Sequence, residues 1–249
     1  ADFSTLSEAL DYAAQGETGA NFYTGRGEMY ATLPYAELRA SARVLARKLL
    51  GMGLEKGDHV ALIAETNPEF LQFFFACQYA GLVPVALPAS IKLGGHTTYV
   101  KQLRGLLESS QAVVAMAPEG YVPYLEEAGE GLGLRMVGAP ETFNSLPEAD
   151  VAFPESGPED VAYIQYTSGS TKFPRGVVIR QRSVMSNLGG IIRHGVRIGP
   201  GDRCFSWLPF YHDMGLVGLV LVPVASQTSV AQPDDAHQGD DFVQPAVRL

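Results

Sequence analysis

The segment Tyr166–Gly176, which reads YTSGSTKFPRG, concentrates groups that bind anions. Gly169 and Gly176 allow backbone conformations closed to residues with a Cβ, so successive N–H groups can converge on an anion. Serine and threonine hydroxyls surround Gly169, and Lys172 and Arg175 add positive charge. Because the whole chain has a formal net charge of -9, this basic loop is a local feature rather than a consequence of composition. The pattern predicts a loop that holds phosphate groups.

This loop is not a Walker A loop, because the chain has no GxxxxGK[ST] pattern. The missing Lys-Ser/Thr pair disfavours a P-loop NTPase. A hairpin turn rich in serine, threonine and glycine is the simpler alternative when residue types alone are considered.

A second polar segment, Leu208–Gly215 with the sequence LPFYHDMG, interrupts two apolar runs. Its His212 is a candidate proton donor, although a lone histidine is more often an ordinary surface or core residue. Phe210 and Tyr211 suit a pocket wall or a core equally well. Asp213 is expected either to orient His212 or to cap the following turn.

The elements that position both segments can be read from the apolar pattern. Strands are expected at Val161–Tyr166 and Gly176–Ile179, on the two sides of the phosphate-type loop, followed by a helix over Ser183–Arg193. A strand over Arg203–Leu208 delivers the second segment.

The first half of the chain alternates helical and strand patterns, as parallel α/β units do. Asn67 is expected to cap one helix and Gly81 to end it. The expected helices are Pro34–Leu50, Glu69–Ala80, Thr97–Ser109 and Tyr121–Gly129, and the expected strands are His59–Ala64, Val83–Leu87, Gln111–Met116 and Leu134–Val137. Pro140–Asp160 is interpreted as a surface connection. The prediction is a layered α/β fold with largely parallel sheets flanked by helices.

Composition excludes several classes of protein. The chain has 249 residues, 46% of them hydrophobic, which suits a globular protein with a substantial core. No run approaches ~20 uninterrupted apolar residues, so no membrane span is expected. The N-terminus lacks the basic and apolar regions of a secretory signal, so a cytoplasmic location is expected.

Charge and cysteine usage exclude two further classes. A pI near 5.0 argues against nucleic-acid binding. The row Arg39, Arg43 and Arg47 is interpreted as the solvated face of a helix. Cys77 and Cys204 have no paired spacing and are interpreted as reduced core thiols, and no Cys/His cluster supports a zinc site.

The two polar segments together resemble the adenylate-forming superfamily. Tyr166–Val177 is similar to its YTSGSTxxPxGV loop, and Leu208–Gly215 is similar to its LPxxHxxG segment. Within the superfamily the chain most resembles the fatty acyl-AMP ligases, and the segments that carry this likeness are Ile164–Thr171, Trp207–Leu216, Tyr79–Pro88 and Thr32–Leu38. The resemblance implies part of the large N-terminal domain of such an enzyme.

The resemblance also implies a reaction and its cofactors. These enzymes bring a carboxylate to the α-phosphate of ATP, release pyrophosphate and leave an acyl adenylate. By resemblance, ATP would be bound by Thr167, Ser168, Gly169, Ser170, Thr171, Lys172 and Gly176, with Mg2+ sharing the phosphate charge. Thr171 is expected to contact the metal through water, and His212 and Lys172 are the expected catalytic residues. Gln181 stands where many members have a histidine, which puts any charged role at that position in doubt.

The resemblance ends near Ser229, which divides the chain into 1–230, a partial AMP-binding domain, and 231–249, an acidic tail expected to be disordered. The expected substrate is a fatty acid. The expected acceptor is an acyl carrier protein or polyketide synthase in lipid or polyketide assembly. Two alternatives stay open: a fatty acyl-CoA ligase, and an inactive remnant that only binds, since the adenine site and the C-terminal domain of the family fall outside this chain.

Overall fold

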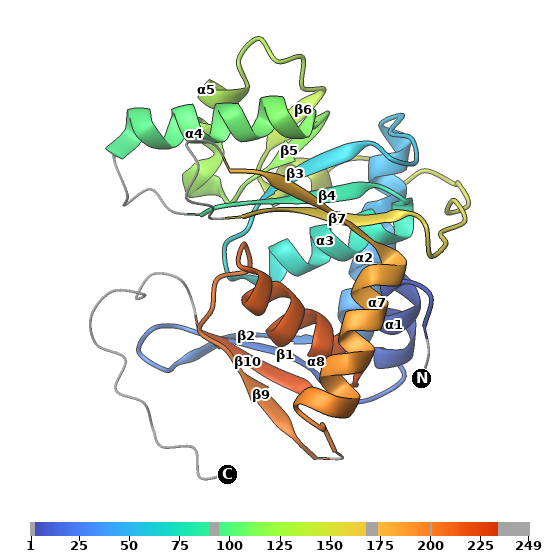
Figure 1. Ribbon diagram of the computed structural model, residues 1–249. Coiled ribbons are helices and arrows are strands. Elements are labelled where there is room, and N and C mark those ends of the chain that lie inside the picture. Colours follow the sequence, from blue (N-terminus) through green and yellow to red (C-terminus); the bar gives the residue numbers. More distant parts are fainter. Residues whose placement is uncertain (1–2, 90–94, 168–173, 200, 234–249) are drawn as a thin grey trace.

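The computed structural model describes residues 3–89, 95–167, 174–199 and 201–233 as two sheets with helices between them (Figure 1). Helices α4 (Gly95–Ser110) and α5 (Val122–Gly129) cover the outer face of the larger sheet. The helices of the middle layer are α1 (Leu6–Ala13), α2 (Tyr35–Gly51), α3 (Pro68–Ala80), α7 (Gln181–Gly190) and α8 (Val222–Ala225). This arrangement gives two cores, one on each face of the larger sheet.

The larger sheet has six strands in the order β6-β5-β3-β4-β7-β8. Its strands are β3 (His59–Ile63), β4 (Val83–Leu87), β5 (Val114–Met116), β6 (Met136–Gly138), β7 (Val161–Tyr166) and β8 (Gly176–Arg180). All neighbours run parallel except β7 and β8, which are antiparallel. The predicted parallel-rich α/β fold is therefore confirmed.

A second sheet has four strands in the order β2-β1-β10-β9. Its strands are β1 (Gly19–Tyr23), β2 (Met29–Pro34), β9 (Arg203–Phe205) and β10 (Ser229–Pro233). The β1–β2 hairpin is antiparallel, whereas β1–β10 and β10–β9 are parallel pairs. The sequence predicted none of the hairpin strands, and it extended β9 to Leu208. The boundary expected at 230/231 falls inside β10, and residues 234–249 lie outside the described residues.

Helix α3 shows how local sequence sets its own limits. The Asn67 side chain accepts a hydrogen bond from the Phe70 N–H at 2.9 Å, as its N-cap position requires. Pro68 opens the helix, where its missing N–H costs nothing. Gly81 ends it in the left-handed conformation with φ 67°, which glycine adopts readily.

The expected surface connection Pro140–Asp160 is wrong for its first part. Residues Pro140–Asn144 form helix α6, and the Phe143 side chain is fully buried. Its ring packs edge-on against Phe73, with the centroids 5.2 Å apart. The proline- and glutamate-rich composition suggested a loop, although Phe143 anchors this segment in the core.

The arginine row expected to be solvated on α2 is half-exposed, opposite the buried leucines, and its members make specific contacts. Arg39 bonds Asp11 at 2.5 Å, and Arg47 forms an ion pair with Glu148. The Arg43 guanidinium lies 4.8 Å from the centre of the Phe153 ring. Arg43 and Arg47 thus fasten the segment before β7 onto α2, and Arg39 ties α2 to α1.

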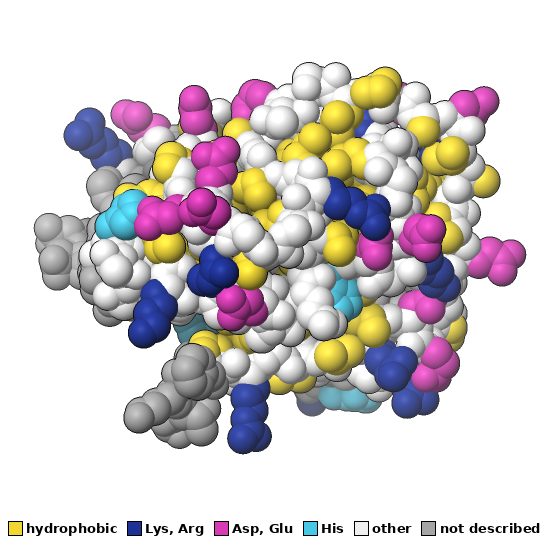
Figure 2. Space-filling view, turned by 90° about the horizontal axis from the view of Figure 1, so that it is seen from above, with side chains coloured by type: hydrophobic (Ala, Val, Ile, Leu, Met, Phe, Trp, Pro, Cys, Tyr) yellow, Lys and Arg dark blue, Asp and Glu magenta, His cyan; other side chains and the backbone are white. Residues whose placement is uncertain are grey.

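The face above α4 and α5 carries acidic and basic side chains side by side, without a basic patch among the described residues there (Figure 2). Within the described ranges, no helix is long and apolar enough to cross a membrane.

Candidate functional site

The site lies where the parallel strands of the larger sheet end. Strands β5, β3, β4 and β7 all run parallel, so their carboxyl ends meet at one edge. Such an edge is where open α/β sheets bind ligands. Thr167 follows β7 directly and is exposed, and the phosphate-type loop therefore begins at this edge.

The base of that loop is closed by backbone contacts. The Thr167 N–H donates to the Arg175 carbonyl at 3.1 Å, and Tyr166 pairs with Gly176 across the two strands. A Cβ on Gly176 would lie 3.2 Å from the side chain of Ile164, so a larger residue would press on β7. Five of the predicted phosphate-binding residues lie outside the described residues: Ser168, Gly169, Ser170, Thr171 and Lys172. The expected metal contact of Thr171 falls in the same segment.

Tyr166 fixes the end of β7 to helix α4. Its hydroxyl donates to the Leu106 carbonyl at 3.2 Å and is hydrogen-bonded to the Ser109 hydroxyl. The loop thus starts from a strand end that is held on its outer side as well as within the sheet.

The second segment, Leu208–Gly215, follows β9, runs into helix η3 (Met214–Leu221) and crosses from the smaller sheet to the larger one. The Gln165 side chain of β7 donates to the Tyr211 carbonyl at 3.2 Å. Phe210 is fully buried and packs against Phe70, with ring centroids 5.3 Å apart. The structure therefore brings the residue next to His212 against the strand that begins the phosphate-type loop.

The turn around His212 is tight. The His212 N–H donates to the Pro209 carbonyl at 3.1 Å, and the Leu216 N–H donates to the His212 carbonyl at 2.9 Å. A Cβ on Gly215 would lie 2.1 Å from the Pro209 carbonyl oxygen, so only glycine fits there. The His212 side chain is exposed, 5.4 Å from the Tyr211 ring between centroids. An imidazole on such a turn is available to an incoming ligand.

Asp213 caps the helix that follows. Its carboxylate accepts a hydrogen bond from the Met214 N–H at 2.7 Å. Of the two expected roles, capping is the one for which the structure provides a contact. Asp213 also faces β7: burial raises the pKa of Tyr163, and the charge of Asp213 raises it further.

Two functional-looking glutamines were missed or undervalued in the sequence. Gln165 was treated only as part of an apolar strand. A polar residue in an otherwise apolar strand was the feature of the sequence that could have identified it. Gln181 is buried, accepting from the Leu6 N–H at 3.0 Å and donating to the Gln78 side chain at 2.8 Å. The Gln181 amide thus joins α7 to α1 and α3.

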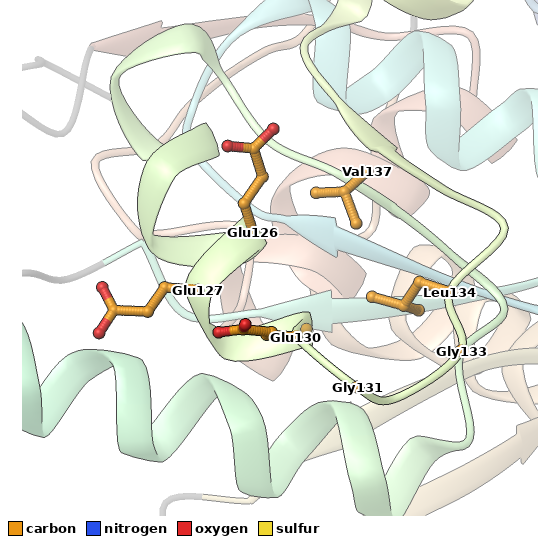
Figure 3. A pocket seen from close by; sticks show the side chains of 8 residues that line it. Glu126, Glu127, Glu130, Gly131, Gly133, Leu134 and Val137 are labelled. Atoms are coloured by element: carbon orange, nitrogen blue, oxygen red, sulfur yellow. The ribbon is translucent and has the colours of Figure 1, made fainter.

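Two hollows lie elsewhere on the part of the chain that the structure describes. One of 490 Å³ opens between α5 and β6, with Glu126, Glu127 and Glu130 on one side and Leu134 and Val137 on the other (Figure 3). Three carboxylates disfavour a phosphate ligand there. A second hollow, of 310 Å³, lies against α7. Neither is lined by the described residues of the two joined segments.

The fold is that of an α/β protein in which the two motif segments meet at the carboxyl ends of the parallel strands. Comparison with known proteins identifies similar chains. The chain is 47% identical over 231 residues to a "Putative acyl-CoA synthetase" of Caulobacter vibrioides, covering 92% of this chain and 40% of that protein. It is 30% identical over 208 residues to the long-chain-fatty-acid–AMP ligase FadD32 of Mycolicibacterium smegmatis, covering 82% and 32%.

A solved structure from work on fatty acyl-adenylate ligases of E. coli and L. pneumophila superposes with a TM-score of 0.89. It is 49% identical and covers 93% of this chain and 42% of that one. The family model of the AMP-binding enzymes matches residues 10–245. The chain therefore belongs to the AMP-binding enzyme family, and it spans about 40% of the length of the first of these relatives.

Proposed function

We propose that the protein activates a fatty acid with ATP, forming the acyl adenylate and releasing pyrophosphate. The observation that carries this proposal is the 3.2 Å hydrogen bond from Gln165 to the Tyr211 carbonyl. It holds the His212 turn beside the end of β7, from which the phosphate-type loop begins. The names of the fatty acyl-AMP and fatty acyl-adenylate ligases among the relatives support the same reaction.

ATP and Mg2+ fit the chemistry of the donors in the loop. Mg2+ keeps several waters and binds through substrate phosphates with few protein ligands, so a dedicated carboxylate cage is not required. Among the described residues no group of three or more His, Cys, Asp or Glu side chains is placed to hold a metal. A hydroxyl such as that of Thr171, together with the phosphates, suits the ion. When bound, Mg2+ offsets the charge of the triphosphate.

The protein's own residues would offset the electrostatic repulsion between a carboxylate and a triphosphate. The loop residues Thr167 to Lys172 would position the β- and γ-phosphates through N–H groups, hydroxyls and the Lys172 ammonium. His212 would donate toward the carboxylate or α-phosphate oxygens, where negative charge concentrates in the transition state. Gly176 would let β8 return close to β7 below the loop.

The acceptor of the acyl group is proposed to be an acyl carrier protein or polyketide synthase, and the setting lipid or polyketide assembly in the cytoplasm. Coenzyme A is the second candidate, favoured by the name of the Caulobacter relative. A different possibility is a chain that, at 40% of that relative's length, binds ligand without catalysing a reaction.

Pyrophosphate release tests the proposal. The chain alone and the chain extended by the C-terminal part of its relatives are incubated with ATP, Mg2+ and fatty acids of increasing length. We expect fatty-acid-dependent release from the extended protein, and transfer of the product to a carrier protein in preference to coenzyme A. Full activity of the 249-residue chain would show that the reaction does not need the added C-terminal part, and ATP hydrolysis without any fatty acid would contradict the proposed reaction.

A further inference from the structure

A single buried glutamine links the two segments of the site. Gln165 is 8% exposed, in a strand whose neighbours Ala162, Tyr163 and Ile164 are apolar or aromatic and buried. Burying an amide without partners costs free energy that an apolar side chain of the same size avoids. The hydrogen bond to the Tyr211 carbonyl accounts for a polar residue at this position.

The backbone of Gln165 lies inside the larger sheet. β7 lies between β4 and β8, and Gln165 is in register with Ala86 on one side and Val177 on the other. Two residues further along, Thr167 begins the phosphate-type loop. The backbone of Gln165 is thus fixed by the sheet, and its amide reaches a different segment.

The segment it reaches is held from several sides. The half-buried Tyr211 side chain packs against the cores on both faces of the larger sheet. Its carbonyl is bound by Gln165, and the next residue is His212, whose N–H donates to the Pro209 carbonyl. The His212 side chain itself is exposed and lies against the Tyr211 ring, so its position depends on the backbone and side chain of this turn.

We infer that Gln165 is a positioning residue: it sets His212 at the correct distance from the phosphates held after β7. This inference rests on the proposed function, because it assigns His212 a ligand. It assigns Gln165 no contact with substrate. A displacement of about 1 Å at a reacting group costs on the order of 100-fold in rate, so one hydrogen bond in this place can control turnover.

The chain contains a matched control in Gln78 of α3. Its side chain is also buried and also donates to a backbone carbonyl, that of Ala162 in the same strand, at 2.7 Å. Ala162 lies at the start of β7, away from the phosphate-type loop. Gln165→Met removes the bond to Tyr211, and Gln78→Met removes the bond to Ala162 together with the one that Gln78 accepts from Gln181. Gln78→Met therefore disturbs the core at least as much, but only Gln165→Met touches the His212 turn.

The kinetic test uses the extended protein and pyrophosphate release. For Gln165→Met we expect kcat to fall by about 10-fold or more while KM for ATP stays within about 3-fold, because phosphate binding is untouched. Gln165→Glu, which keeps the shape but points a carboxylate at a carbonyl, is expected to do the same. Gln78→Met is expected to keep both constants within about 3-fold, although its melting temperature falls. Equal losses of kcat in Gln165→Met and Gln78→Met at matched stability would overturn the inference.

A second readout is independent of activity. The imidazole carbon–proton signal of His212, assigned by its loss in His212→Ala, is recorded by NMR in the 249-residue chain. We expect it to shift in Gln165→Met and to stay in place in Gln78→Met. An unchanged signal in Gln165→Met overturns the inference. Absence of fatty-acid-dependent turnover in the unmutated protein contradicts the proposed function instead, and the NMR comparison still decides the role of Gln165.

Discussion

The turn that carries His212 depends on one glycine. Gly215 faces the Pro209 carbonyl so closely that an added Cβ would sit 2.1 Å from its oxygen, and the contacting atoms belong to the backbone and cannot rotate away. The glycine of the LPxxHxxG segment is therefore required by packing, independently of any catalytic role.

Gly215→Ala is expected to lower the free energy of unfolding by about 2 kcal/mol or more, because the turn must open to admit the methyl group. Gly189→Ala in α7 is the control, since a Cβ there meets nothing within 4 Å. It should raise the free energy of unfolding by about 0.5–1 kcal/mol, as alanine does in a helix. Urea unfolding of both variants measures the difference, and equal stabilities would show that the turn is not tight.

His212→Ala in the extended protein is expected to slow acyl-adenylate formation by at least about 10-fold, since it removes a donor to developing charge. His194→Ala, at an exposed position in helix η2 (Ile191–Gly195), should have no effect. Single-turnover kinetics with product detection by mass spectrometry compares them. A change of less than about 3-fold, or about 0.65 kcal/mol of barrier, would assign His212 no direct role.

Strand β7 is the element that organises the site. At its start, Asp160 accepts the Gln181 N–H through its carbonyl at 2.9 Å and bonds Lys56 through its carboxylate at 2.8 Å. One residue into the strand, the Ala162 carbonyl accepts from the Gln78 side chain, and near its end the Gln165 side chain donates to the Tyr211 carbonyl. Polar contacts along one strand thus tie helices α3 and α7 and the His212 turn to the base of the phosphate-type loop.

The first of these contacts predicts a dependence on pH. Burial acts to raise the pKa of Asp160, but the hydrogen bonds from Lys56 and the Gly157 N–H, with the Lys56 charge, outweigh it and lower the pKa. The pKa of Asp160 in the folded protein therefore lies below its unfolded value of about 3.9. The ion pair stabilises the folded state above about pH 3.9, and this stabilisation is lost as the pH falls through the folded pKa.

Asp160→Asn should therefore lower the free energy of unfolding at pH 7 by about 0.5–1 kcal/mol, a modest value because the Lys56 side chain is 43% exposed. The difference from the unmutated chain should shrink as the pH falls below about 4. Chemical unfolding at several pH values measures it. A difference that is the same at pH 7 and at pH 3 would contradict the ionic origin.

Among the helices and strands, the sequence predicted limits that are set by neighbouring residues and missed contacts between residues far apart in the chain. Asn67, Pro68 and Gly81 define α3 within the segment itself, so its limits could be predicted. The pairing of Ala20 with Val230 joins residues 210 positions apart, and no local pattern encodes it. Gln165 was missed for the same reason, because its partner Tyr211 is distant in sequence.

For the whole molecule, the two sheets end in exposed apolar side chains near the site. Phe205 and Trp207, on and after the edge strand β9, are 42% and 54% exposed, and Val178 of the edge strand β8 is 54% exposed. Edge strands with exposed apolar groups favour association. The chain spans 40% of the length of its Caulobacter relative, and we propose that the remainder of such a protein covers these positions.

The isolated 249-residue chain is accordingly expected to self-associate as its concentration rises. Replacing both Phe205 and Trp207 by serine should shift the mass measured by light scattering toward the monomer, whereas Val196→Ser, 67% exposed at the end of a helix, should not. A chain that stays monomeric at all concentrations would contradict the expectation.

In the proposed reaction, β7 and the His212 turn form one adenylating site. Exchange of labelled pyrophosphate into ATP by the extended protein measures that step directly, because it requires reversible acyl-adenylate formation. We predict exchange that depends on a fatty acid and falls by at least about 10-fold in both His212→Ala and Gln165→Met, but not in Gln78→Met. Exchange that is absent with every fatty acid, or that occurs without one, would contradict the account.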